Sequence, residues 1–155
     1  MEIRLAEYRD IPGMIALLHQ VGQVHHDIRP DIFRDGALKY DEAALEQLVK
    51  EEDKPIFVAV EQGFVAGYCF CQLRCTTGSS VLTDRAELYI DDLCVDENCR
   101  GQGIATALYR YAVDFARDLN AHSVTLNVWC GNESALRFYE KMGMKKRNIM
   151  METKL

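Results

Sequence analysis

Apolar residues recur at two spacings along this chain, one typical of strands and one typical of helices. Residues 2–8 alternate, with Ile3 and Leu5 as the apolar positions, and this alternation predicts a first strand. A helical stripe follows, with Asp10 at its expected start and Pro12 in its first turn. Residues 24–33 mix aromatic and charged side chains around a proline, so we expect a loop or a broken helix there.

The middle of the chain predicts a second helix and then a meander of three strands. Asp41 is placed to cap the helix, and Lys54 and Pro55 are placed to end it. Residues 56–60, 64–73 and 85–95 are rich in β-branched and aromatic side chains, with turn residues between them. Each of these runs is therefore expected to be a strand.

The last third of the chain predicts a helix, a strand, a short helix and a final strand. From residue 104 the apolar positions have a helical spacing, and residues 122–129 then alternate. A strand that follows a strand and a helix is expected to pair in parallel. Asn132 or Ser134 starts the short helix, Gly143 ends it, and residues 145–155 are expected to complete the sheet.

Composition and charge narrow the class of protein. The 155 residues show no repeat or linker, so residues 1–155 are predicted to form a single mixed α/β domain. The net charge is −6 without a basic tract, which argues against nucleic acid as a partner and is compatible with a cationic amine. No run reaches the ~20 apolar residues of a membrane span, so no membrane partner is expected. Six cysteines without zinc-ligand spacing predict reduced thiols, no metal and a cytoplasmic location.

The stretch from Leu88 to Leu108 joins an apolar strand pattern to a helix through a glycine loop. The first backbone N–H groups of a helix have no intrahelical partner, and the helix dipole adds partial positive charge there. Gly101 and Gly103 let the backbone approach an anion closely, and Arg100 adds a full positive charge. We therefore interpret the loop as a cradle for a phosphate or pyrophosphate. A glycine turn that binds no ligand is the alternative.

Two common phosphate-binding templates do not fit this loop. A P-loop needs Lys and then Ser or Thr after its second glycine, whereas Gly103 is followed by Ile104. The dinucleotide fingerprint needs Gly or Ala where this chain has Thr106. The arrangement Arg-x-x-Gly-x-Ala instead resembles the acetyl-coenzyme A (acetyl-CoA) signature of the GNAT superfamily of N-acetyltransferases. The order of the predicted elements is similar to that of the superfamily over nearly the whole chain.

The resemblance implies a fold and a cofactor site. The expected fold is a central mixed sheet of six to seven strands flanked by about four helices. A bulge in the strand before the loop would leave the backbone at Leu93, Cys94 and Val95 free for the thioester carbonyl and the pantetheine arm. The pyrophosphate would lie on the loop backbone, which comprises Arg100, Gly101, Gln102, Gly103, Ile104, Ala105 and Thr106.

A second segment resembles the superfamily pattern Asn-x-x-Ala-x-x-x-Tyr-x-x-x-Gly, from Asn132 to Gly143. Asn132 would hydrogen-bond the pantetheine or cap the helix. Tyr139 would donate a proton to the departing thiolate. A phenol and a thiol have ordinary pKa values of about 10 and 8.5, so this transfer is uphill but feasible when it is coupled to thioester cleavage. The alternative for Tyr139 is a core aromatic at helical spacing.

Asp91 and Asp92 are the candidates for the general base. Neighbouring residues of a regular strand face opposite sides, although a bulge could rotate one of the two. The strand is similar to that of polyamine acetyltransferases, where a Glu-Asp pair stands here, and this implies Asp91 first and Asp92 second as base or amine anchor. One aspartate could instead serve only as a cap or an ion-pair partner. The resemblance also places His26, with His25 beside it, on the acceptor side.

The residues and the resemblance together predict an acetyl-CoA-dependent N-acetyltransferase that works by direct attack of an amine. The acceptor is expected to be a small cationic amine. A protein N-terminus, a peptidyl lysine or an aminoglycoside remains an alternative acceptor, and a non-catalytic acyl-CoA-binding module is the alternative of a different class. Exposed strand edges near residues 145–155 suggest a homodimer through sheet continuation.

Overall fold

The computed structural model describes every residue from Met1 to Leu155. Short 3-10 turns lie at Tyr8–Asp10 and Glu97–Cys99. The longer elements follow one another as β1 (Glu2–Leu5), α1 (Ile11–Ile28), α2 (Glu42–Leu48), β2 (Ile56–Glu61), β3 (Phe64–Thr76), β4 (Arg85–Val95), α3 (Ile104–Asp118), β5 (Ser123–Leu126) and α4 (Glu133–Lys141). No helix is both long and apolar enough to cross a membrane.

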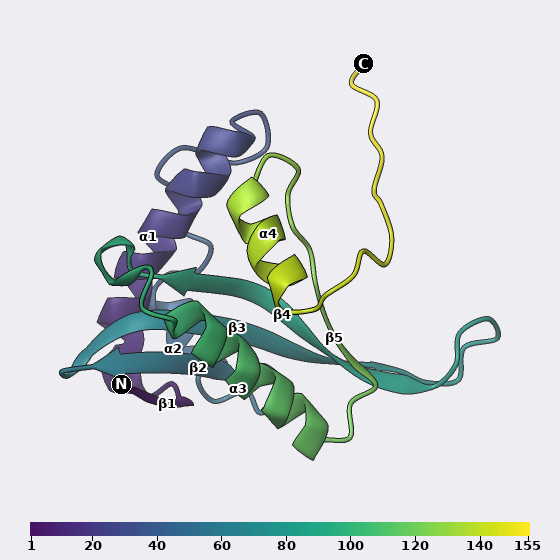
Figure 1. The fold of residues 1–155 in the computed structure, drawn as a ribbon, viewed down its shortest axis with the longest axis horizontal. Helices are drawn as coiled ribbons and strands as arrows, with labels where there is room; N and C mark the ends of the chain where they lie inside the picture. Colours follow the sequence, from purple (N-terminus) through teal and green to yellow (C-terminus); the bar gives the residue numbers. More distant parts are fainter.

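The strands form one mixed sheet in the order β1-β2-β3-β4-β5 (Figure 1). The first three neighbouring pairs are antiparallel, and β4 and β5 are parallel. The α3 helix connects the two parallel strands, as the crossover rule requires. The mixed α/β fold and its four helices are confirmed, whereas the predicted count of six to seven strands is wrong because the sheet has five.

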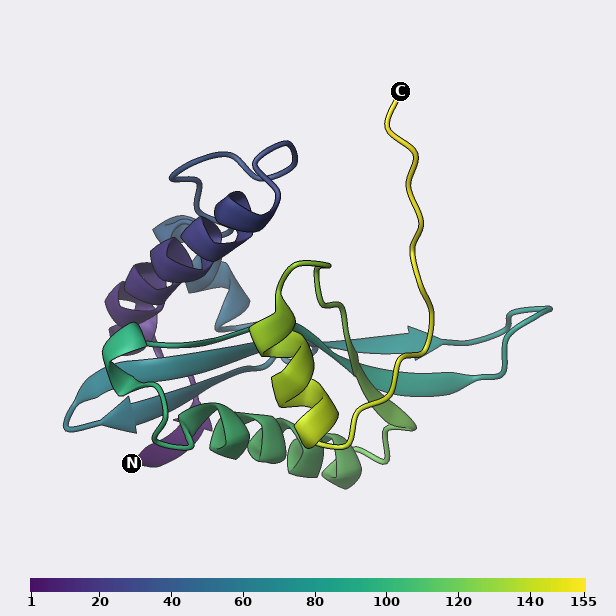
Figure 2. The same ribbon diagram turned by 45° about the horizontal axis from the view of Figure 1, so that its top comes forward.

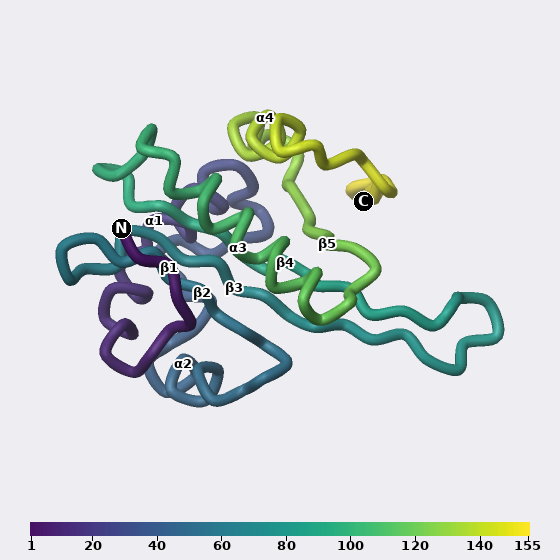
Figure 3. Tube along the Cα trace, turned by 60° about the horizontal axis from the view of Figure 1, so that its bottom comes forward, coloured from purple at the N-terminus to yellow at the C-terminus, as the bar shows by residue number.

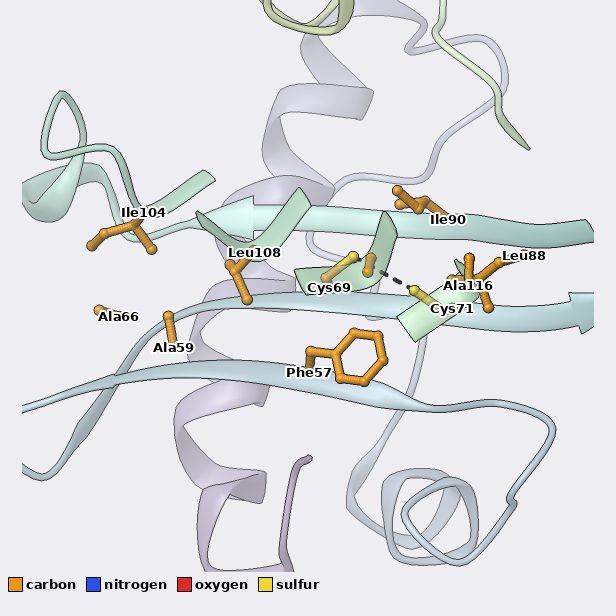
Figure 4. Close-up of a cluster of buried hydrophobic side chains, with 11 residues drawn as sticks. Phe57, Ala59, Ala66, Cys69, Cys71, Leu88, Ile90, Ile104, Leu108 and Ala116 are labelled. Atoms are coloured by element: carbon orange, nitrogen blue, oxygen red, sulfur yellow. Dashed lines mark hydrogen bonds between the residues drawn. The ribbon is translucent and has the colours of Figure 1, made fainter. Parts of the chain in front are cut away.

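Helices cover both faces of the sheet (Figure 2). The α1 and α2 helices pack on one face, where they meet the inward side chains of β2, β3 and β4. The α3 helix packs on the other face, around the buried cluster that Figure 4 shows. The buried positions of α3 follow the helical spacing seen in the sequence, at Ile104, Leu108, Ala112 and Ala116.

The predicted last strand over residues 145–155 is absent. This segment leaves α4 and runs away from the sheet (Figures 1 and 3), and Ile149, Met150 and Met151 are 75%, 95% and 84% exposed. Three apolar residues in a row do not define an inner and an outer face, so the alternation there is too weak to fix a strand register. Ion pairs hold the segment instead, from Arg147 to Glu87 at 2.7 Å and from Glu152 to Arg29 at 2.7 Å.

Two element bounds also differ from the prediction. The segment expected to be a loop or a broken helix is the latter: α1 continues into it and ends at Ile28, because Pro30 disfavours helical backbone at the residue before it. The strand predicted over residues 122–129 is limited to Ser123–Leu126. Both differences shape the candidate site, since α1 carries its histidines and the early end of β5 opens a gap beside β4.

Candidate active site

The two parallel strands separate beside the predicted cofactor loop. Pairing between β4 and β5 runs from Glu87 with Ser123 to Ile90 with Leu126 and then stops. Beyond Ile90, β4 continues to Val95 with β3 as its only neighbouring strand, while the chain after β5 turns toward α4 (Figure 1). One edge of β4 is therefore open from residue 91 to 95, and its backbone groups can pair with an extended ligand.

A bulge in β4 lies at the start of this open edge. Phe70 of β3 is opposite Asp92 and Cys71 is opposite Ile90, so Asp91 is an extra residue without a partner. The β4 side chains that pack on the α3 face show the resulting change of phase, because they are Leu88, Ile90, Leu93 and Val95. From Ile90 to Leu93 the interval is three residues, where a regular strand would have two. This shift turns the Asp92 side chain to the α1 face, together with Cys94.

The bulge brings both aspartates to the acceptor side of the sheet. The Tyr40 hydroxyl donates a hydrogen bond to Asp91 Oδ2 at 3.0 Å, and Lys39 Nζ lies 2.7 Å from the same oxygen. Both partners come from the segment that joins α1 to α2. Asp91 is therefore paired with a cation of the chain itself, which the sequence did not indicate.

Asp92 has a different environment. The Tyr68 hydroxyl donates a hydrogen bond to Asp92 Oδ2 at 2.9 Å. Burial raises the pKa of Asp92 above its ordinary value, although the Tyr68 hydrogen bond and the positive charges of Lys39 and His25 oppose this effect. A carboxylate with a raised pKa binds a proton more strongly than an ordinary aspartate does, which is the property needed in a general base.

The histidines occupy the last turn of α1. His26 Nδ1 lies 2.8 Å from the Phe33 carbonyl oxygen, and no hydrogen bond or ion pair joins His26 to either aspartate. His25 stacks on Phe33 with ring centroids 5.0 Å apart, and Phe33 meets Trp129 edge-on at 5.1 Å. Burial lowers the pKa of His25, while the charge of Asp92 raises it. His25 is thus the histidine whose charge interacts with that of Asp92.

The glycine loop has the backbone that an anion site needs. Gly101 and Gly103 have φ values of +79° and +81°, a region that favours glycine. Gly103 is the N-cap of α3, with no side-chain cap and no acidic residue in the first turn. The first amides of α3 therefore remain available for an anion. Arg100 is exposed, and its Nε donates to the Val95 carbonyl oxygen at 3.4 Å.

Gln20 of α1 braces this loop, a contact for which the sequence contains no signal. Its side-chain nitrogen donates to Asp96 Oδ2 at 3.1 Å, and its oxygen accepts from the Glu97 backbone N–H at 3.1 Å. The two bonds fix the chain between the end of β4 and the glycines. Lys39, Tyr40, Tyr68 and Gln20 were all missed from the sequence because each reaches the site from a distant segment.

The α4 helix places the other predicted site residues. Asn132 Oδ1 accepts a hydrogen bond from the Ala135 backbone N–H at 3.2 Å, so Asn132 caps the helix. Tyr139 is half-buried, with its ring centroid 5.0 Å from that of Phe138 and 6.2 Å from that of Tyr109. Burial raises the pKa of Tyr139, and the negative charge of Asp92 adds to this effect. The phenol therefore keeps its proton at neutral pH.

Comparison with known proteins gives this arrangement a context. Residues 21–144 match the family described as "Acetyltransferase (GNAT) family". The "Uncharacterized N-acetyltransferase MJ1207" of Methanocaldococcus jannaschii is 29% identical over 103 residues, which are 66% of this chain and 44% of that protein. This chain thus spans less than half the length of that relative.

Other relatives match over most of both chains. "N-alpha-acetyltransferase 30" of Schizosaccharomyces pombe is 27% identical over 84% of this chain and 83% of that protein. "Peptidyl-lysine N-acetyltransferase YjaB" of Salmonella typhimurium is 29% identical over 94% of this chain and 83% of that protein.

A solved structure has nearly the same fold. The crystal structure of a tetramutant of the BH1408 protein from Bacillus halodurans superposes with a TM-score of 0.95 at 30% identity, and the match covers 100% of both chains. Together with the family match over most of the sequence, this agreement shows that the chain belongs to the GNAT family of acetyltransferases.

Proposed function

We propose that the protein transfers an acetyl group from acetyl-CoA to a primary amine by direct attack of that amine. The observation that carries the proposal is the β4 bulge, which places Asp91 and Asp92 together beside the open edge of the strand. One side of this edge is a backbone that no neighbouring strand pairs, with long side-chain contacts only to the Asp91 and Val95 carbonyl oxygens, and the other side holds two carboxylates. A thioester and an amine bound at these two places would meet at the bulge.

The chain's own backbone would hold the cofactor. We assign the open edge at Leu93, Cys94 and Val95 to the pantetheine arm and the amides from Gly101 to Thr106 to the pyrophosphate. Bound acetyl-CoA supplies an activated acetyl group. Arg100 adds positive charge at the loop mouth. Because Asn132 Oδ1 already accepts the capping hydrogen bond, we assign the amide nitrogen of Asn132, which no protein group engages, to the pantetheine.

Asp92 is our first choice for the general base, and Asp91 becomes the second. This reverses the order that the resemblance implied, because Lys39 and Tyr40 already engage Asp91. The raised pKa of Asp92 suits proton removal from the attacking ammonium, directly or through one water. Tyr139, whose pKa is raised by burial, would return a proton to the departing thiolate.

The proposed acceptor is a small cationic amine, since two carboxylates at the bulge favour a positive charge. A peptide N-terminus or a peptidyl lysine is the second candidate, favoured by the names of two of the relatives that match over most of the chain. An aminoglycoside is the third candidate acceptor. A non-catalytic acyl-CoA-binding module is the candidate function of a different class. The cytoplasmic location and the absence of a metal stay predictions.

The test is a thiol-release assay with acetyl-CoA and a panel of amines: spermidine, lysine, peptides with free N-termini, and aminoglycosides. We expect turnover with the small polyamines and a lower kcat/KM with the peptides. A matched sample without amine gives the background hydrolysis. Turnover restricted to peptides would contradict the proposed acceptor class. Binding of acetyl-CoA without turnover of any amine would favour the binding module.

A further inference from the structure

A primary amine of the chain itself lies at the proposed acceptor site. Lys39 Nζ is 2.7 Å from Asp91 Oδ2 and donates to the Asp91 backbone oxygen at 3.4 Å. Asp91 is the extra residue of the bulge, so this ammonium lies at the point where β4 and β5 separate. The Lys39 side chain is 43% exposed and that of Asp91 only 14%, which means that the amine enters the site from its solvent side.

The other ion-paired lysines lie elsewhere. Lys54 pairs with Glu51 beside α2, Lys146 with Glu140 on α4, and Lys154 with Asp31 near the chain end. Lys39 is the lysine whose ammonium contacts one of the two bulge acids. The Lys39 side chain is an alkylammonium, and it reaches Asp91 from the segment between α1 and α2.

We propose that Lys39 is itself an acetyl acceptor, so that the protein acetylates a lysine at the entrance to its own acceptor site. This inference rests on the proposed function. The Lys39 ammonium loses a proton to Asp92 or to water, and neutral Nζ attacks the thioester carbonyl carbon. The new N–C bond forms as the C–S bond breaks, and the sulfur leaves with the electron pair and takes a proton from Tyr139. Nitrogen then releases its second proton, which passes through water to the Tyr139 oxygen and restores the phenol. The products are acetyl-lysine, free coenzyme A and the one proton first taken up by Asp92 or water.

The modification would change the charge at the site. Acetyl-lysine is neutral, so Asp91 would lose its cationic partner and keep the Tyr40 hydroxyl as a hydrogen-bond donor. A cationic acceptor would then meet an unpaired carboxylate at the bulge. The modified protein should consequently have a lower KM for cationic amines than the unmodified protein, in which Lys39 competes for Asp91.

An ion pair that only fastens the α1–α2 segment to β4 would show the same distances. The two roles differ in what happens when acetyl-CoA is present without an added amine. A fastening lysine would react no faster than other exposed lysines. An acceptor lysine would react by an intramolecular step at a rate that depends on Tyr139.

The experiment incubates the full-length protein with acetyl-CoA that carries a deuterated acetyl group, so that new acetyl groups are distinguishable from old ones. Peptide mass spectrometry then follows Lys39 and, as the matched control, exposed Lys50, whose ammonium lies over the Tyr8 ring. We expect Lys39 to be labelled at least about tenfold faster than Lys50, with a rate constant independent of protein concentration. Tyr139→Phe should slow labelling of Lys39 and leave that of Lys50 unchanged.

Further outcomes distinguish the acetylation of Lys39 from the proposed function itself. Lys39→Arg keeps the ion pair but offers no acceptor amine, so the total acetyl label per chain should fall to that of the slowly labelled lysines, and the labelling rate of Lys50 should not change. Turnover of an added amine together with equal labelling of Lys39 and Lys50 would overturn this inference and leave the proposed function intact. If the protein acetylates neither an added amine nor Lys39, both are overturned.

Discussion

Asp92 combines a raised pKa with a place at the bulge, and this combination predicts opposite effects on activity and stability. Because the folded-state pKa is raised, the charged carboxylate at neutral pH is a cost to folding. Asp92→Asn removes that cost, so the melting temperature should not fall. The kcat should drop by about 10²–10⁴-fold, the usual contribution of a general base. Steady-state kinetics and calorimetry on the same sample measure both quantities.

Asp91→Asn is the matched control for this prediction. It alters the neighbouring carboxylate, which Lys39 and Tyr40 already hold, so we expect a change mainly in KM. A large loss of kcat in Asp91→Asn with little loss in Asp92→Asn would show that the order implied by the resemblance was correct.

Asp10 lies at the predicted start of a helix, but its side chain has a different role from the predicted one. The sequence placed it as a helix cap, but its carboxylate accepts hydrogen bonds from Arg4 at 2.6 and 3.0 Å and from the Glu7 backbone N–H at 2.8 Å. Burial raises the pKa of Asp10, yet the bonds from Arg4 and Glu7 outweigh burial and leave the pKa below its ordinary value.

The lowered pKa of Asp10 predicts a pH-dependent stability. The stabilisation is fully present above the unfolded-state pKa of about 3.9 and is lost as the pH falls through the lower folded-state pKa. Asp10→Asn should therefore cost about 3 kcal/mol at neutral pH, because it removes the two short bonds to Arg4 and leaves only the longer ion pair of Arg4 with Glu7, and much less in acid. Urea denaturation of both proteins at neutral pH and in acid measures the difference in the free energy of unfolding. An equal loss of stability in Asp10→Asn under the two conditions would contradict the role of the ion pair.

At the scale of elements, the strands and helices with a regular apolar period were predictable. The α3 helix and the β2–β4 meander follow their patterns, because each buries one face against a continuous core. The bulge at Asp91 could not be placed from the sequence alone. It depends on the register between β3 and β4, and on the gap left where β5 ends at Leu126.

The α4 helix offers a test of the two roles considered for Asn132. Asn132→Ala removes the cap and should cost about 1 kcal/mol of stability. Asn132→Asp keeps the accepting oxygen and should restore the stability. If the side-chain nitrogen also contacts the pantetheine, coenzyme A affinity stays weak in Asn132→Asp, as isothermal titration calorimetry would show. Full recovery of affinity would limit Asn132 to capping.

At the scale of the whole molecule, the sheet and the chain end leave two unpaired surfaces. The outer edge of β5 has no neighbour, and residues 145–155 form no strand while exposing Ile149, Met150 and Met151. The sequence could not reveal this, because an apolar end segment can pair within its own chain, pair with another chain or stay unpaired. We propose that the two surfaces meet between copies, which would add a strand to each sheet and cover the apolar residues.

This proposal predicts a homodimer that depends on the chain end. Sedimentation analysis should give a dimer for the full chain and a monomer for residues 1–144. Replacing Met150 and Met151 by Ser should weaken the dimer without removing the ion pairs of Arg147 and Glu152. A full-length protein that stays monomeric at high micromolar concentration would contradict it.

Tyr139→Phe tests the central claim most directly, because it removes one hydroxyl from a half-buried ring and leaves the ring contacts with Phe138 and Tyr109 in place. The measurement is the rate of coenzyme A release with a saturating amine, together with the dissociation constant of acetyl-CoA. We predict a fall in kcat of about 10²-fold or more with little change in acetyl-CoA affinity. An unchanged kcat would show that Tyr139 is a packing residue and that the proposed direct transfer uses another proton donor.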